Sequence, residues 1–359
     1  WILEGAAVHV SMVGFDDGSE ITRLLDDTPV DEIHADLTSA ANLTQAVVLP
    51  ENANLSFIGT QKTGPLDLTP EQAFALLIAG GNPNGRPNRD VLRPWVNGSD
   101  ITRRPRGMWI IDFGCDMPLE QAAQYEAPFE YVRTHVLPSR KGARPASLEE
   151  TWWLMARPRP AMRAALEGLG QYIVVPRVAK HLVFVWVDPP TLPDSATVAF
   201  AREDDYFFGV LHSRLHELWA RRQGTQLREA ESASRYTPTT CFETYPFPWP
   251  PGEEPGGVTP GQEGDPLVRT IAEAARELDA KREAWLNPPD ASQKELKRRT
   301  LTNLYNAYPT WLALAHRKLD EAVLAAYGWP QELAEPSPEH DQEILRRLLA
   351  LNLERAGTG

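Results

Sequence analysis

The spacing of hydrophobic and polar residues changes along the chain and predicts different elements in different regions. Residues 5–15 alternate small or polar with apolar side chains and end at an Asp-Asp-Gly turn signal, which predicts a strand followed by a hairpin turn. A strand this early has no sheet to join, and it suggests the edge of a domain whose body lies upstream. Further strands are predicted at 108–113, 172–178, 181–187 and 197–200.

Helical patterns lie between these strands. A cap residue, Thr69, followed by Pro70 begins one helix, and the Gly-rich stretch from Gly80 ends it. Residues 119–136 and 160–169 are also predicted to be helical. The strongest pattern is at 205–222, where apolar residues recur at spacings of three and four.

The pattern changes again after residue 245. Residues 245–251 are rich in proline and are predicted to be extended, and residues 253–265 have the composition of a linker. From residue 266 onward only helical patterns occur, and the last of them begins at Ser337 and Pro338.

These elements predict an α+β fold: a mixed α/β domain followed by a small all-α helical bundle. Along the chain we expect four segments. They are the tail of an upstream domain with a connector (1–50), the mixed α/β domain (51–252), a linker (253–265) and the helical domain (266–359). Trp1 at the start, with no Met and no leader, predicts that the sequence is an interior piece of a longer protein.

Composition narrows the class of protein. The chain has 359 residues, 42% hydrophobic and 24% charged, which excludes disordered, collagen-like and membrane-spanning chains and allows two or three hydrophobic cores. Two cysteines, Cys115 and Cys241, are too few for a disulfide framework, so we expect a reducing, cytoplasmic location.

The formal charge of −13 argues against a nucleic-acid partner until it is divided by region. Residues 1–85 carry −10 and residues 188–359 carry −8, whereas residues 86–187 carry 15 Lys and Arg against 10 Asp and Glu. The positive residues of this basic island are nearly all Arg, which suits bidentate contact with phosphate and guanine.

Three candidate chemistries are weak. Asn287-Pro-Pro-Asp290 is similar to the Asn-Pro-Pro-aromatic motif of amino-methyltransferases, but an aspartate replaces the ring that stacks on a flipped base, so we expect a turn between helices. His212 and His216 stand four apart, but Ser213 replaces the glutamate of a zinc helix and no third ligand is near, so packing is expected. No Gly-rich nucleotide loop follows a predicted strand. We therefore expect no catalytic residue, no cofactor and no metal in this chain.

Two clusters are candidates for binding. Arg177, Lys180 and His181 are expected at a tight connection between two strands, where they offer hydrogen-bond donors on a rigid support. Arg235, Tyr236, Thr239 and Thr240 combine hydroxyl groups, which commonly hold phosphate oxygens, with one cation. Solvated cations at a rim and local Ser/Thr turns are the alternative interpretations of the two clusters.

Long, ordered motifs then indicate a family. Several segments together resemble the MmeI-like class of DNA adenine methyltransferases. They are residues 84–106 with 108–113, and then residues 172–181, 212–219, 236–249 and 301–305. The resemblance is to the C-terminal part of that family. It implies the end of a methyltransferase domain, then a target recognition domain over 51–252, then a helical C-terminal domain. Members use S-adenosylmethionine to methylate the N6 amine of adenine in restriction-modification systems.

The family's cofactor loop and catalytic motif would lie upstream of Trp1. Our hypothesis is therefore a module that recognises double-stranded DNA, joined to an upstream methyltransferase domain of the same polypeptide, with no membrane partner and no activity alone. Arg103, Arg104 and Arg106 are expected to contact the backbone or bases, with Arg177, Lys180 and His181 nearest the major-groove edges.

A hypothesis from another class remains open. Acidic ends, the Pro-rich segment and a helical bundle would also suit a protein–protein scaffold without DNA binding. An independent hydrolase lacks a nucleophile and base arrangement. DNA binding that weakens steeply with salt would distinguish a recognition module from a scaffold.

Overall fold

The structure is a computed structural model that describes residues 13–15, 17–19, 22–25, 27–30, 33, 41–226 and 233–357. The chain divides into two compact units, each discontinuous in sequence. Unit 1 comprises Trp1–Ala53, Asp205–Asp279 and Thr310–Gly359, and unit 2 comprises Asn54–Asp204 and Ala280–Pro309. The strand predicted at 5–15 lies mostly outside the described residues. The α+β fold class is confirmed, and from residue 266 onward every described regular element is a helix.

Unit 2 contains two four-stranded sheets and one further short strand. The first sheet has the order β10-β5-β6-β4, and the second has the order β3-β11-β7-β9. The strand bounds are β3 (Ser56–Ile58), β4 (Asp67–Leu68), β5 (Leu92–Val96), β6 (Trp109–Ile111), β7 (Tyr172–Pro176), β8 (Val178–Ala179), β9 (Val185–Val187), β10 (Leu192–Pro193) and β11 (Thr197–Phe200).

The second sheet is the buried centre of unit 2. All its pairs are antiparallel, and Ile173 of β7 lies opposite Trp186 on one side and Phe200 on the other. Every residue of β7 is buried, as its unbroken apolar run predicts. The predicted tight connection after β7 is wrong, because residues 177–184 separate β7 from β9 and include β8.

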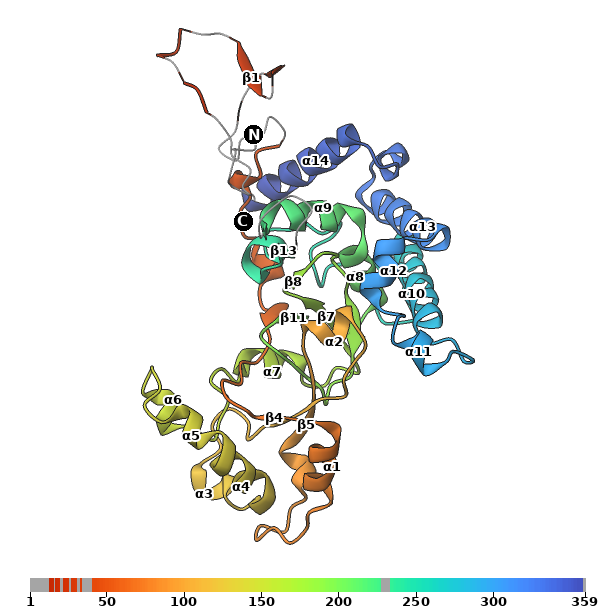
Figure 1. The fold of residues 1–359 in the computed structure, drawn as a ribbon. Helices are drawn as coiled ribbons and strands as arrows, with labels where there is room; N and C mark the ends of the chain where they lie inside the picture. Colours follow the sequence, from red (N-terminus) through yellow and green to blue (C-terminus); the bar gives the residue numbers. More distant parts are fainter. Residues whose placement is uncertain are drawn as a thin grey trace. The chain divides into compact units, whose positions relative to one another are not determined.

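The first sheet shares its apolar core with residues of α1, α3 and α4, such as Ala73, Ala122 and Val132. Strand β5 pairs antiparallel with β6 and parallel with β10, and the apolar core around β5 and β6 includes Trp95, Ile110 and Phe113. Figure 1 shows α1 and the run α3 to α6 flanking strands β4 and β5. The bounds are α1 (Pro70–Ile78), η3 (Asn88–Asp90), α2 (Gly98–Thr102), α3 (Leu119–Ala122), α4 (Glu126–His135), α5 (Leu137–Arg140), α6 (Ser147–Glu150), α7 (Pro160–Leu166), α11 (Gln293–Leu296) and α12 (Leu301–Ala307).

Local signals decide where these helices begin. Helix α1 starts as predicted, since Thr69 caps it and Gln72 completes a capping box. The single helix predicted at 119–136 is wrong and is instead α3 and α4. Pro128 explains the break, because a proline is tolerated in the first turn of α4 but would disrupt the interior of a continuous helix.

Unit 1 is mainly helical. The bounds of its elements are β1 (Arg23–Leu25), β2 (Thr28–Val30), η1 (Leu43–Gln45), η2 (Pro50–Asn52), α8 (Asp205–His212), α9 (Arg214–Gln223), β12 (Thr225–Gln226), β13 (Ser234–Arg235), the π-helical turn η4 (Pro238–Phe242), α13 (Thr310–Tyr327), η5 (Gln331–Ala334) and α14 (Pro338–Gly357). Strands β1 and β2 form one antiparallel pair, and β12 and β13 form another. Helix α10 (Pro266–Leu286) contributes to both units, since the division falls after Asp279.

The helix predicted at 205–222 is interrupted at Ser213. This residue is extended, with φ −67° and ψ 150°, and its hydroxyl accepts a hydrogen bond from the His216 N–H while donating to the Val210 carbonyl. A serine that satisfies both neighbouring helix ends explains why one apolar pattern becomes the two helices α8 and α9.

Aromatic rings fill the core of unit 1. Phe207 stacks on Phe247 with ring centroids 4.8 Å apart, and Trp219 donates its Nε1–H to the Thr244 hydroxyl. The Pro-rich stretch at 245–251 is extended, and it buries Tyr245 and Phe247 in this core. Residues 253–265 form a packed loop, in which Glu254 and Glu263 are buried. Among the described helices, none is long and apolar enough to cross a membrane.

Candidate nucleic-acid interface

The first part of the candidate interface is built on α2 of unit 2. Asn97 caps this short helix and Asp100 completes a capping box, so the chain leaves the helix at Arg103 in a fixed direction. Arg103 is exposed, and its side chain makes no ion pair with any described residue. It is therefore available to an anionic partner.

The other two predicted arginines of this segment have internal partners. Arg106 binds both oxygens of Asp100, at 2.8 and 3.0 Å. Burial opposes ionisation of Asp100, but hydrogen bonds from Arg106 and from backbone N–H groups outweigh it and keep the pKa of Asp100 below its usual value. Arg104 donates to the Leu286 carbonyl and to Oδ1 of Asn287 at 2.9 Å. These two arginines position the segment, and Arg103 is the one that extends from it.

The second part is an asparagine that joins two predicted residues. Oδ1 of Asn306, on α12, lies 2.9 Å from Nζ of Lys180 and 2.9 Å from Nε2 of His181. Because this oxygen can only accept, His181 carries its proton on Nε2 in this arrangement. Asn306 and Lys180 are both exposed, so the amide group and the ammonium lie at the surface.

Helix α12 links two groups that the sequence analysis treats separately, the segment after α2 that holds Arg103 and the pair Lys180 and His181. The Thr302 hydroxyl donates to the Thr102 carbonyl at the end of α2, and Asn306 binds Lys180 and His181 one turn further along. Residues that are distant in sequence thus share one side of unit 2.

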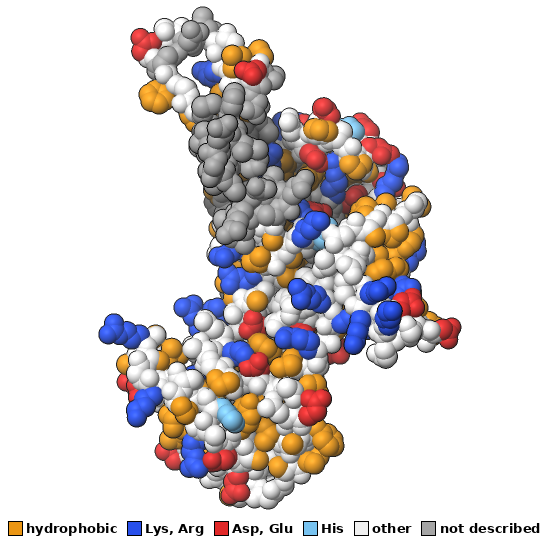
Figure 2. All heavy atoms as spheres, in the orientation of Figure 1, with side chains coloured by type: hydrophobic (Ala, Val, Ile, Leu, Met, Phe, Trp, Pro, Cys, Tyr) orange, Lys and Arg blue, Asp and Glu red, His pale blue; other side chains and the backbone are white. Residues whose placement is uncertain are grey.

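Helix α11 and the turn after it add cations that were not predicted as site residues from the sequence. Lys294, Lys297 and Arg298 are exposed and form no ion pair among the described residues. Figure 2 shows Lys and Arg side chains gathered over α2, α11 and α12. We call the set Arg103, Lys180, Lys294, Lys297 and Arg298 the basic face.

Arg177 is placed differently from Lys180 and His181. Its backbone N–H donates to Ala196, and its Nη1 donates to the Ser195 carbonyl at 3.1 Å. The side chain is half-buried rather than projecting from a rim.

The predicted cluster at 235–240 belongs to unit 1. Arg235, Thr239 and Thr240 are exposed, whereas Tyr236 is only 2% exposed. The Tyr236 hydroxyl lies 3.1 Å from Nε2 of His216, and burial raises the pKa of this phenol well above its ordinary value. Tyr236 thus offers no surface to DNA in this structure, and its role is in the core.

The two helical histidines are packing residues, as expected. Nδ1 of His212 lies near the Phe208 carbonyl and Nδ1 of His216 near the Leu211 carbonyl, and both rings are buried. No group of three or more His, Cys, Asp or Glu suited to a metal ion occurs among the described residues.

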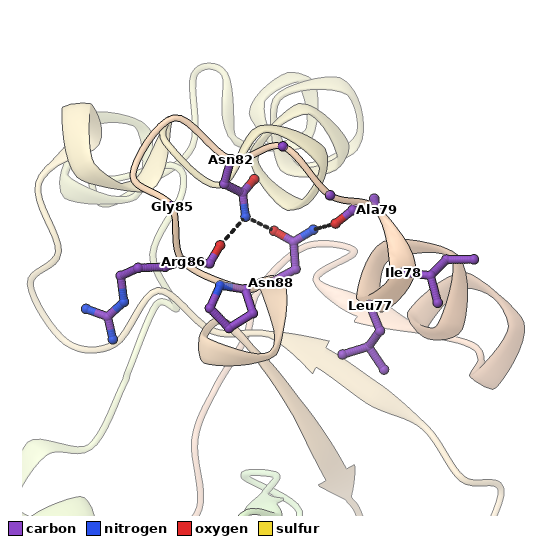
Figure 3. Close-up of a pocket in the computed structure, with 10 residues that line it drawn as sticks. Leu77, Ile78, Ala79, Asn82, Gly85, Arg86 and Asn88 are labelled. Carbon is purple, nitrogen blue, oxygen red and sulfur yellow. Dashed lines mark hydrogen bonds between the residues drawn. The ribbon is translucent and has the colours of Figure 1, made fainter.

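One pocket of unit 2 lies beside the Gly-rich loop that follows α1. It encloses about 400 Å³ and is lined by residues 77–82 and 85–88. Asn88 donates to the Leu76 and Ala79 carbonyls and accepts from Asn82, which also donates to the Arg86 carbonyl, as Figure 3 shows in part. Since these amides hydrogen-bond to one another and to the carbonyls at the end of α1, we assign them to stabilising the loop and not to binding a ligand.

The α+β fold of the chain is that of a type IIL restriction-modification enzyme, MmeI, whose structure was solved in complex with DNA. That structure matches 92% of this chain with a TM-score of 0.65 at 18% sequence identity, and the chain spans 39% of its length.

The family match is narrower than the structural one. Residues 127–249 match the family described as MmeI, target recognition domain. The resemblance drawn from the sequence is thus confirmed: the chain is MmeI-like and contains a target recognition domain. Among curated proteins, no relative matches the sequence.

The matched range does not include all of the basic face. Lys180 lies inside it, whereas Arg103, Asn306 and the α11 cations lie outside. The run Lys294-Glu-Leu-Lys-Arg-Arg299 is a signal of this surface, but it lies within the region that the sequence predicts to be a helical domain. Asn306 had no signal in the sequence, because its partners stand more than 120 residues away.

Proposed function

We propose that the chain is the DNA-recognition module of a restriction-modification enzyme and that unit 2 binds double-stranded DNA. The observation that carries this proposal is the basic face, whose exposed cations gather over α2, α11 and α12 and include the lysine of the Lys180–Asn306–His181 contact. Cations on one surface neutralise phosphates, and adjacent amide and imidazole donors suit base edges. The DNA complex of the similar MmeI enzyme supports the same assignment.

Roles within this surface follow from the contacts. Arg103 and the α11 cations are assigned to phosphates, because long, exposed side chains without ion-pair partners carry charge without fixed direction. Lys180, His181 and Asn306 are assigned to base edges, because their hydrogen bonds fix donor positions. Arg104 and Arg106 position the α2 segment, and Arg235, Thr239 and Thr240 of unit 1 are proposed as separate phosphate contacts.

The finer proposal concerns the whole enzyme. We infer that it methylates the N6 amine of adenine at a specific site, using S-adenosylmethionine held by an upstream methyltransferase domain of the same polypeptide. On this proposal the present chain holds no cofactor and does not methylate alone, and it works in the cytoplasm. Methyl transfer to DNA by the isolated chain would contradict the proposal that the upstream domain carries the activity.

The test is the salt dependence of DNA binding by the full chain. Fluorescence anisotropy with a labelled duplex between 50 and 200 mM KCl should give an affinity that falls linearly with salt on a log–log plot. The double variant Lys180→Ala, Asn306→Ala should weaken binding by roughly tenfold and reduce discrimination between duplex sequences.

Arg133→Ala is the matched control, since Arg133 is exposed in the same unit but paired with Glu130. It should bind as the wild type does. If the wild-type chain shows no salt-dependent binding to any duplex, the scaffold hypothesis replaces this one.

A further inference from the structure

We propose that Arg157, Arg159 and Arg177 form an arginine cluster that binds a phosphate of the DNA backbone, at a place separate from the basic face. The proposal rests on the proposed function of unit 2 and adds a site to it. Of its members, Arg157 and Arg159 were not predicted as site residues from the sequence.

Backbone hydrogen bonds bring the three arginines together. Residues 59–61 form the centre: Gln61 exchanges hydrogen bonds with Arg157 on one side, and Thr60 pairs with residues 193–195 on the other. Arg159 donates from Nε to the Gly59 carbonyl, and Arg177 donates from Nη1 to the Ser195 carbonyl. The two guanidinium groups are thus anchored to neighbouring parts of one backbone layer.

This layer is tightly packed. A Cβ atom at Gly59 would lie 2.3 Å from the Asp194 carbonyl oxygen, so only glycine allows the two segments to approach this closely. Arg159 also holds a left-handed backbone conformation, with φ 60°, which is unusual for a residue with a side chain. Both features fix the position of the Arg159 guanidinium.

Two of the three arginines, Arg157 and Arg159, lack the carboxylate partner that other arginines of unit 2 have. Seven of the fourteen other arginines of unit 2 have carboxylate partners. These ion pairs are Arg86 with Asp90, Arg93 and Arg163 with Asp112, Arg106 with Asp100, Arg133 with Glu130, Arg202 with Asp204, and Arg299 with Glu295. Neither Arg157 nor Arg159 pairs with a carboxylate among the described residues. Asp194, which is close in the fold, accepts the Ala196 N–H instead.

Like charges acting on one another are costly without an anion. Burial lowers the pKa of Arg159, and the positive charges of Arg157 and Arg177 lower it further. Arg157 is exposed and Arg159 is half-buried, so solvent and ligands can reach the group. A single phosphate oxyanion would relieve the repulsion and accept hydrogen bonds from the planar guanidinium groups.

The experiment compares Arg157→Gln and Arg159→Gln with Arg133→Ala as the control. Arg157 has no side-chain partner among the described residues, so its variant should fold normally, which circular dichroism and thermal unfolding would verify. Anisotropy is measured on two duplexes of unrelated sequence across the salt series. Each variant should lose about threefold to tenfold in affinity at 100 mM KCl, equally on both duplexes, with the salt slope reduced by about one.

The outcomes separate this proposal from the proposed function. If the wild-type chain binds DNA steeply with salt but both variants bind identically to it, the arginine cluster is refuted and the function stands. A loss confined to one duplex sequence would make these arginines base readers and overturn the phosphate assignment. If the wild-type chain binds no duplex, the proposed function fails first and the cluster fails with it.

Discussion

Unit 1 and unit 2 differ in charge far more than in size. Unit 2 carries 23 Lys and Arg against 19 Asp and Glu, a formal charge of +4, whereas unit 1 carries 13 against 30, a charge of −17. The acidity of the whole chain is therefore a property of unit 1. A net charge is informative about a partner only after it has been assigned to the bodies that the fold creates.

The two units also use buried charge differently. Unit 2 buries the guanidinium of Arg140 among carbonyl oxygens and pairs its buried carboxylates with arginines, whereas unit 1 buries Asp320, which accepts the Arg214 N–H, and the imidazole of His216. Some arginines of unit 2 thus stabilise its fold, whereas others lie exposed at its surface. Three experiments test this contrast.

The first experiment removes the buried charge of unit 2. Arg140 is 1% exposed and donates to the carbonyls of Lys62, Thr63 and Leu154 at 2.6 to 2.9 Å. Arg140→Met keeps much of the apolar stem but leaves these acceptors unpaired. We expect the free energy of unfolding of unit 2 to fall by about 3 to 5 kcal/mol, measured by hydrogen exchange on β6 and α4.

Its control is Arg133→Met, which removes an exposed arginine of the same unit and should change the stability by less than about 1 kcal/mol. Equal hydrogen exchange in the two variants would show that Arg140 contributes no more than a surface residue does.

The second experiment concerns pH and unit 1. Burial raises the pKa of Asp320 to about 7 from its ordinary 3.8, although the Arg214 N–H partly opposes the shift. Burial lowers the pKa of His216 to about 4 from 6.5. The stabilising contribution of Asp320 is full below about pH 4 and is lost as the pH rises to 7. That of His216 is full above pH 6.5 and is lost as the pH falls to 4.

Because these contributions oppose each other over the same range, the wild-type stability of unit 1 should be nearly flat between pH 4 and 7. Asp320→Asn keeps an oxygen for the Arg214 N–H but cannot ionise. It should expose the His216 slope, a gain of about 3 kcal/mol from pH 4 to 7.

Hydrogen exchange on α9 and α13 would measure this slope. Lys318→Gln, at an exposed position on the same helix, should leave the wild-type profile unchanged. A flat profile for Asp320→Asn would show that His216 does not titrate as described.

The third experiment removes one cation from each unit. Lys318 is exposed but paired with Glu277, so Lys318→Ala should change duplex affinity by less than about twofold. Lys297→Ala, which removes an unpaired cation of the basic face, should weaken binding by about threefold at low salt. Anisotropy on the same duplex compares the two, and equal losses would contradict the assignment of DNA binding to unit 2.

Local elements were predictable and distant contacts were not. The start of α1 at Pro70 and the start of α14 at Pro338 follow from cap signals within a few residues. The break at Ser213 could not be inferred from the apolar pattern, because serine also occurs within helices and only its two hydrogen bonds decide the outcome. The fold class depends on local signals and was correct.

The candidate site also depends on distant contacts that could not be predicted from the sequence. Arg103 and Arg140 look equivalent in the basic island, yet one is exposed and the other is buried against carbonyls some 77 residues away. Residue type predicted that an arginine surface exists. Which arginines form it depends on backbone segments that meet only in the folded chain.

The Asn306 contact has a consequence for selectivity. One oxygen holds two donors before any ligand arrives, so binding at this point exchanges partners instead of creating new ones. A base edge with well-placed acceptors replaces the internal bond at little cost. A base edge without such acceptors leaves Lys180 and His181 bonded to Asn306, and it forms no new hydrogen bond that favours binding. If Lys180 and His181 read base edges as proposed, the closed arrangement is the reference state for each base, and selectivity arises from the difference between the two sets of hydrogen bonds.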